Sequence, residues 1–84
     1  MITVEYTIKN EEGLHARPAA LISKKASEFK SKISLIKDGA EYEAKSILML
    51  MTIGAEKGET ITIKAEGDDE KEAIDALITV LNNI

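Results

Sequence analysis

Two segments of this chain alternate between apolar and polar residues, a pattern typical of strands with one buried face and one wet face. The apolar positions in residues 2–9 and 60–65 are Ile2, Val4, Tyr6, Ile8, Ile61, Ile63 and Ala65. Parallel sheets that are covered on both faces carry continuous apolar runs instead, so the alternation favours an antiparallel sheet. We therefore expect a sheet that packs against helices on one face and meets water on the other.

Apolar residues recur at helical spacing in three other segments. Helices are expected over residues 18–29, 46–53 and 70–83. Ser46 has the character of an N-cap for the short middle helix, and Gly54 that of the residue ending it. Asp69 and Glu72 have the spacing of an Asp-led capping box for the last helix.

Two more strands complete the expected order of elements. They lie at residues 33–35 and 40–43, and Asp38-Gly39 between them is typical of a tight hairpin turn. The resulting order is βαββαβα, which predicts a two-layer open-faced α/β sandwich with its helices on one sheet face. A chain of 84 residues has room for one core, so residues 1–84 are expected to form a single domain.

Composition excludes several classes of function. A net charge of −4 argues against a nucleic-acid interface. One histidine and no cysteine make a metal site improbable, and Asp68, Asp69 and Glu70 are better explained by the start of a helix. No apolar run approaches the ~20 residues that span a bilayer, and the N-terminus lacks the pattern of a signal peptide. We expect a cytoplasmic protein with no cofactor and no membrane insertion.

The stretch from Gly13 to Pro18 holds the only histidine, arginine and proline of the chain. Pro18 suits a first helical turn, which places His15 at or just before a helix N-terminus. Free backbone N–H groups there favour an anion, and the forked Arg17 guanidinium matches phosphate. A neutral imidazole in that position is a nucleophile. The alternative is an ordinary solvated histidine and arginine.

The short helix after Ser46 carries six large apolar residues up to Ile53. A short helix on a core hides only one stripe, so several of them should be exposed as a docking patch. The alternative is a more deeply sunk helix in which Met fills gaps. Lys24, Lys25 and Lys45 are candidates to help Arg17 attract an acidic partner, and ordinary solubility is the alternative.

The segment Gly13-Leu14-His15-Ala16-Arg17-Pro18-Ala19, with Ser46-Ile47, the Asp38-Gly39 turn and Gly54, resembles the HPr family. These proteins are the histidine-containing phosphocarriers of the bacterial sugar phosphotransferase system. The resemblance covers essentially the whole chain. It implies a four-stranded antiparallel sheet in the order 1-4-2-3 with three helices on one face.

The resemblance also implies an activity. Enzyme I, charged from phosphoenolpyruvate, would pass a phosphoryl group to His15 at Nδ1, and enzyme IIA domains of sugar permeases would receive it. Ala16 and Arg17 would bind the phosphoryl oxygens. Such a carrier acts as a monomer, needs no cofactor or metal, and has no turnover of its own. The docking residues would be Ala20, Lys24, Ile47, Leu48 and Met51, and Met49 stands where many members have glycine.

Ser46 has two interpretations. It is an N-cap on physical grounds, whereas in many Gram-positive members the matching serine is phosphorylated by a dedicated kinase. The partners would then include HPr kinase/phosphorylase and a catabolite-control transcription factor. Three alternatives remain: a nitrogen-branch phosphotransferase carrier, a regulatory paralogue without the active histidine, against which His15 argues, and a non-catalytic protein-interaction module.

Overall fold

The computed structural model describes residues 1–84 and has the expected order of elements. The elements are β1 (Ile2–Thr7), α1 (Ala16–Ala26), β2 (Lys32–Lys37), β3 (Ala40–Glu43), α2 (Ile47–Met51), β4 (Thr60–Glu66) and α3 (Glu70–Asn82). Both alternating segments are strands, which confirms the sheet prediction at its two clearest points. No helix is long and apolar enough to cross a bilayer.

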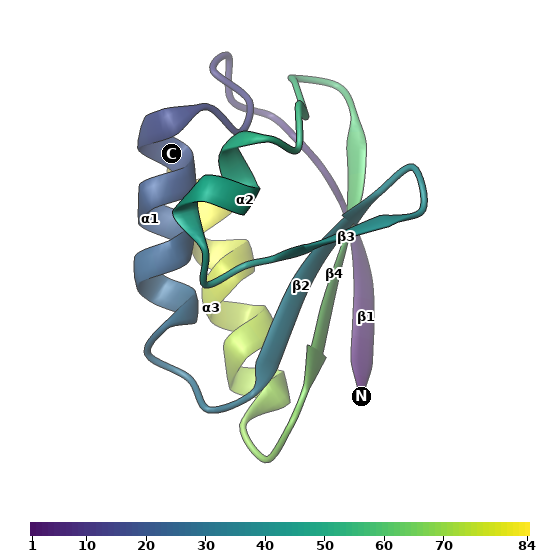
Figure 1. Cartoon of the computed structure of the whole chain (residues 1–84), viewed down its shortest axis with the longest axis vertical. Coiled ribbons are helices and arrows are strands. Elements are labelled where there is room, and N and C mark those ends of the chain that lie inside the picture. Colours follow the sequence, from purple (N-terminus) through teal and green to yellow (C-terminus); the bar gives the residue numbers. More distant parts are fainter.

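The four strands form one antiparallel sheet in the order β1-β4-β2-β3. All three helices cover the same face of this sheet, and the other face is open (Figure 1). The structure therefore confirms the open-faced sandwich and the strand order. The core lies between the layers, where Ile61, Ile63 and Ala65 of β4 are buried with Leu77 of α3.

The first helix is shifted relative to the prediction. It begins at Ala16, which makes His15 the N-cap, and it ends at Ala26. The chain then tightens into a turn, in which the N–H of Glu28 donates to the carbonyl of Lys25 at 3.1 Å and the N–H of Phe29 to the carbonyl of Ala26 at 3.2 Å. Phe29 lies in the following turn, partly buried against the core.

The short helix α2 ends earlier than its sequence suggests. Its last residue is Met51, and Thr52 is the C-cap, with its hydroxyl donating to the carbonyl of Met49 at 2.7 Å. Gly54 has a φ of 67°, but it turns the chain after the helix has already ended. Assigning the helix end to Gly54 was therefore wrong.

The predicted capping box at Asp69 is also wrong. The Asp69 side chain makes no cap bond and instead accepts hydrogen bonds from the backbone N–H of Lys30 (2.8 Å) and from the N–H (2.9 Å) and hydroxyl (2.5 Å) of Ser31. Glu70, and not Glu72, bonds backward, to the N–H of Gly67 at 3.1 Å. Partners distant in sequence thus outcompete the local cap.

Candidate functional site

His15 lies exposed at the N-terminal end of α1. It is the N-cap residue, with extended backbone angles (φ −80°, ψ −167°), and its carbonyl accepts the N–H of Ala19 at 2.9 Å. Its side chain makes no capping hydrogen bond. The imidazole is therefore free to react, and the predicted place of His15 at the helix start is confirmed.

The first turn of α1 presents free hydrogen-bond donors beside this imidazole. The N–H groups of Ala16 and Arg17 donate to no atom of the chain, and Pro18 has no N–H. The turn also contains no acidic residue. Amides at a helix N-terminus carry partial positive charge, so this turn favours an anion attached to His15.

The loop before His15 is held in place by the backbone. Leu14 is buried, and its N–H donates to the carbonyl of Ala55 at 2.9 Å. Gly13 has a φ of 62°, and a Cβ on it would lie 2.4 Å from that same carbonyl oxygen. The close approach requires glycine, so His15 is fixed in position although its side chain is exposed.

A second loop supports the first at the same end of the molecule. The loop before α1 and the loop before β4 lie side by side there (Figure 1), joined by the backbone bond from Leu14 to Ala55 and by an ion pair between Glu11 and Lys57. The amide of Asn10 donates to the carbonyl of Gly13 at 2.8 Å and closes the first loop on itself. The site is thus built from two segments far apart in the sequence.

Arg17 has a partner that the sequence analysis did not anticipate. Its Nη2 is paired with Oε1 of Glu12. The Arg17 side chain is 59% exposed and the Glu12 side chain is 50% exposed. Glu12 precedes Arg17 by five residues across a turn of irregular backbone. Only this proximity in sequence could have suggested the pair.

The apolar residues of α2 divide into two sets. Leu50 is fully buried and Ile53 nearly so, whereas Leu48 is 78% exposed. Ile47, Met49 and Met51 are exposed as well. We call Ile47, Leu48, Met49 and Met51 the α2 patch. Their exposure confirms the surface interpretation of this helix against the sunken one.

Ser46 is the N-cap of α2, as predicted. Its hydroxyl oxygen accepts the N–H of Met49 at 3.3 Å, and its carbonyl accepts the N–H of Leu50 at 3.0 Å. The side chain is half-buried at the start of the helix that carries the α2 patch. Any charge added to Ser46 would therefore lie next to the patch.

The three candidate lysines differ in what their ammonium groups contact. Lys45 donates to the carbonyl of Phe29 at 2.8 Å, and Lys25 is paired with Glu28 at 3.1 Å. Lys24 is exposed and belongs to no ion pair, and Ala20 on the same helix is also exposed. Lys24 is thus the lysine of the three whose ammonium has no hydrogen-bond or ion-pair partner in the chain.

A groove on the surface has no contribution from His15. It has a volume of about 360 Å³ and lies between α1 and the C-terminal end of α3, lined by Leu21, Lys24, Val80 and Ile84 among others. Leu21 is exposed, and the sequence analysis did not single it out. His15 is exposed and is not among the residues that line this groove.

By its fold and site, this chain is a small βαββαβα domain with an exposed histidine at the start of its first helix. Residues 2–83 match the family described as "PTS HPr component phosphorylation site". The chain belongs to this HPr family of phosphocarriers, and the resemblance found in its sequence is confirmed.

Relatives support the assignment along the whole chain. The phosphocarrier protein HPr of Mycoplasma pneumoniae is 44% identical over 96% of this chain and 93% of its own. The HPr-like protein Crh of Halalkalibacterium halodurans is also 44% identical, over 96% of each chain. The structure of HPr from Thermoanaerobacter tengcongensis superposes with a TM-score of 0.94 at 47% identity, covering 99% of this chain and 93% of its own. A second structure of that protein is a dimer (TM-score 0.78, 99% and 95% covered).

Proposed function

We propose that this chain accepts a phosphoryl group from enzyme I on His15 and passes it to enzyme IIA domains of sugar permeases, in the cytoplasm. The observation that carries this proposal is the exposed imidazole at the N-cap of α1 beside the unpartnered amides of Ala16 and Arg17. Membership of the HPr family supports the same conclusion.

The proposed transfer places few demands on the protein. The lone pair of Nδ1 forms a bond to phosphorus while the bond between phosphorus and the donor atom breaks, and the proton of the ring stays on Nε2. The amides of Ala16 and Arg17 and the Arg17 guanidinium then receive the phosphoryl oxygens. Phosphoryl transfer depends mostly on such positioning and charge stabilisation. The second transfer reverses these bond changes on the receiving domain.

The proposed docking surface combines the α2 patch with Ala20 and Lys24 of α1. The two helices pack against each other, and the patch residues are exposed. An exposed apolar patch on α2, with the positive charges of Arg17 and Lys24 on the neighbouring helix α1, suits a partner with an apolar centre and an acidic rim. We propose that the carrier acts as a monomer, since a dimer through this surface would cover it.

Incubation with enzyme I and phosphoenolpyruvate tests the proposal. We expect the mass to rise by one phosphoryl group per chain, attached through nitrogen and therefore lost in acid and kept in base. His15→Ala should fold normally, because the side chain is exposed, and should gain no mass. Arg17→Ala should still be labelled, more slowly. Normal labelling of His15→Ala would disprove the carrier function.

We also propose that Ser46 is a regulatory phosphorylation site for HPr kinase/phosphorylase, and that the phosphorylated form binds a catabolite-control transcription factor. A negative charge at the start of α2 suits the helix but lies beside the α2 patch. Ser46→Asp should melt no earlier than the parent and should accept phosphate from enzyme I several-fold more slowly. Ser46→Ala is the control, since it loses the cap but adds no charge. If Ser46→Asp and Ser46→Ala accepted phosphate from enzyme I at equal rates, the proposed regulation through charge at Ser46 would be contradicted.

A further inference from the structure

We propose that Glu12 is a positioning residue for the phosphoryl group: it holds the Arg17 guanidinium in the unphosphorylated chain and competes with the phosphoryl group for it. The inference rests on the proposed carrier function and extends it. Its basis is the ion pair between Glu12 and Arg17, three residues before and two residues after His15.

The position of Glu12 makes this competition unavoidable. Glu12 belongs to the loop that Gly13 and Leu14 fix against the backbone of Ala55. Arg17 lies in the first turn of α1, beside the free amides. The backbone that carries Glu12 is therefore held near the helix start, and the ion pair with Arg17 keeps the carboxylate at the end of α1 where a phosphoryl group on His15 would lie.

A carboxylate and a phosphoryl group make similar demands on a guanidinium, since each offers oxygens to its forked donors. Arg17 is the only arginine of the chain, so one fork serves both anions. When His15 is phosphorylated, Arg17 must give up contact with Glu12 or share itself between two negative groups that repel each other. The phosphorylated form is thereby raised in free energy relative to the unphosphorylated form.

The consequence concerns how readily the phosphoryl group leaves. A carrier must release the group as easily as it accepts it, and Glu12 shifts the balance toward release. The pair is exposed and screened by water, so its effect is small. Exposed ion pairs of this kind correspond to changes of about two- to fivefold in an equilibrium constant.

The neighbouring residue provides a matched control. Glu11 carries the same charge in the same loop, but its partner is Lys57 of the other loop. Glu11→Gln and Glu12→Gln therefore remove the same charge from adjacent positions, and only the second frees Arg17. Glu12→Asp keeps a carboxylate, and Arg17→Ala removes the group through which Glu12 is proposed to act.

Two measurements test the inference. The first is the equilibrium fraction of phosphorylated chain at a fixed ratio of phosphoenolpyruvate to pyruvate with enzyme I present. The second is the affinity of the unphosphorylated chain for inorganic phosphate, followed by NMR at the amides of Ala16 and Arg17. We expect Glu12→Gln to raise both equilibrium constants about two- to fivefold, less so at high salt, where charges are screened. Glu11→Gln should match the parent, and Glu12→Asp should lie near it.

The outcomes separate this inference from the carrier function. Equal constants for Glu12→Gln and Glu11→Gln, or an effect of Glu12→Gln that persists unchanged in an Arg17→Ala background, would overturn the role of Glu12. Both results leave labelling of the parent at His15 intact. Failure of the parent to be labelled would overturn the carrier function instead, and the phosphate titration would then decide by itself whether Glu12 competes for Arg17.

Discussion

At the scale of single residues, the proposed phosphoryl acceptor, His15, is exposed while the backbone before it is held in place. His15 follows Leu14, whose side chain is buried, and precedes a helix of which it is the N-cap. Gly13 permits the close backbone approach that anchors this segment to Ala55. The exposed imidazole therefore has a fixed origin, and its amide neighbours Ala16 and Arg17 are fixed with it. Preorganisation of this kind reduces the reorganisation that phosphoryl transfer would require.

Gly13→Ala tests the anchor. An alanine there must keep a φ of 62° and must also place its Cβ 2.4 Å from the carbonyl oxygen of Ala55. Gly39→Ala is the control, because its φ is 82° but nothing lies within 4 Å of the added Cβ. A left-handed alanine alone costs about 1–2 kcal/mol. We expect urea denaturation to show a clearly larger loss for Gly13→Ala than for Gly39→Ala. Equal losses would show that the contact with Ala55 is unimportant.

The site residues differ in how far the sequence predicts them. His15 and Arg17 follow from a compact motif, because the helix start and its free amides are local properties. The pairing of Arg17 with Glu12 does not, because it depends on how the irregular segment from Glu12 to His15 turns back. The ammonium of Lys45 contacts the carbonyl of Phe29 for the same kind of reason, since 16 residues separate them. Such contacts between separate segments can be identified only in the structure.

At the scale of elements, α2 is a five-residue helix that carries more apolar surface than it can hide. It is held by the Ser46 cap and by two buried side chains, Leu50 and Ile53. Such a short helix is unstable in isolation, so packing on the sandwich is what maintains it. The side chains that do not contribute to this packing make up the α2 patch, and an exposed apolar cluster of this kind is typical of a docking surface, as proposed above.

Leu48→Ala and Leu50→Ala compare the two faces of α2. Leu48 is 78% exposed and Leu50 is 0% exposed, two positions apart on one helix. We expect Leu48→Ala to change the free energy of unfolding by less than about 0.5 kcal/mol, and Leu50→Ala to lower it by about 2–5 kcal/mol. If Leu48 lies at the centre of an interface with partners, Leu48→Ala should also weaken binding to enzyme I by about 2 kcal/mol or more. Calorimetry and chemical denaturation give both quantities. Normal binding by Leu48→Ala would contradict the docking role.

Element types were more predictable than element ends. The alternation in β1 and β4 and the helical spacing in α1 and α3 are averages over many residues, and both were confirmed. Helix ends are decided by one or two bonds. After Ala26 the N–H groups of Glu28 and Phe29 bond carbonyls only three residues back, and α1 ends. The Asp69 carboxylate bonds Ser31, which is 38 residues away, and makes no cap bond. Such a distant partner cannot be read from the local sequence.

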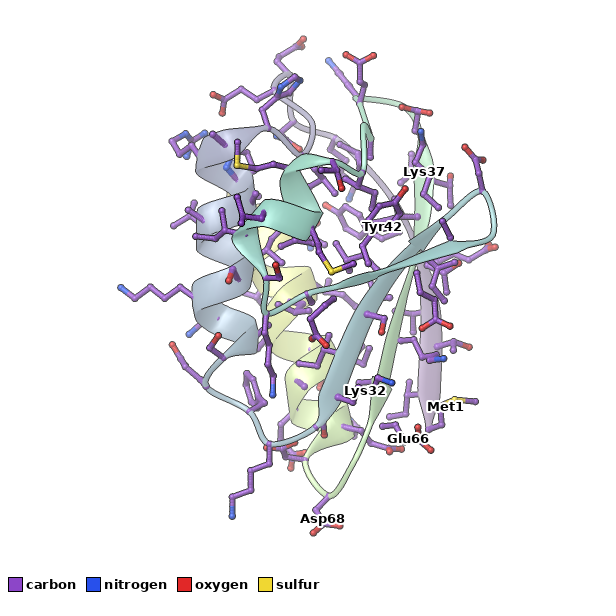
Figure 2. The ribbon with its side chains drawn as sticks, viewed as in Figure 1. Met1, Lys32, Lys37, Tyr42, Glu66 and Asp68 are labelled. Atoms are coloured by element: carbon purple, nitrogen blue, oxygen red, sulfur yellow. The ribbon has the colours of Figure 1, made fainter.

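At the scale of the whole molecule, the two ends of the sheet differ: one holds the loops around His15, and the other holds contacts that stabilise the fold. The loops around His15 and the α2 helix gather at one end (Figure 1), while Met1, Glu66 and Asp68 lie at the opposite end (Figure 2). At that far end the Asp69 carboxylate joins the segment after α1 to the start of α3. The N-terminal ammonium of Met1 is also paired with Glu70, at 3.0 Å. We therefore expect that stability can be altered there without touching the proposed phosphate site around His15.

Asp69→Asn tests this separation. The hydroxyl of Ser31 and the backbone N–H groups of Lys30 and Ser31 stabilise the charged carboxylate and hold the pKa of Asp69 below its usual value. A lowered pKa in the folded state contributes stability above the unfolded pKa, near about 4, and that contribution is lost as the pH falls through the folded pKa. We expect Asp69→Asn to unfold at a lower urea concentration than the parent at pH 7. The difference between their two urea midpoints should shrink below about pH 4.

The control for Asp69→Asn is Asp68→Asn, since the exposed Asp68 side chain makes no contact comparable to that of Asp69. It should unfold like the parent at every pH. Labelling by enzyme I should be unchanged in both variants, because neither position lies near His15. A difference in urea midpoint between the parent and Asp69→Asn that stays constant from pH 7 to pH 3 would mean that the shape of the side chain, and not its charge, matters at position 69. Slower labelling of Asp69→Asn at pH 7 would show that the two ends of the sheet are coupled. Helix α1 would then be the connection, since Asp69 bonds the segment that follows this helix and His15 is its N-cap.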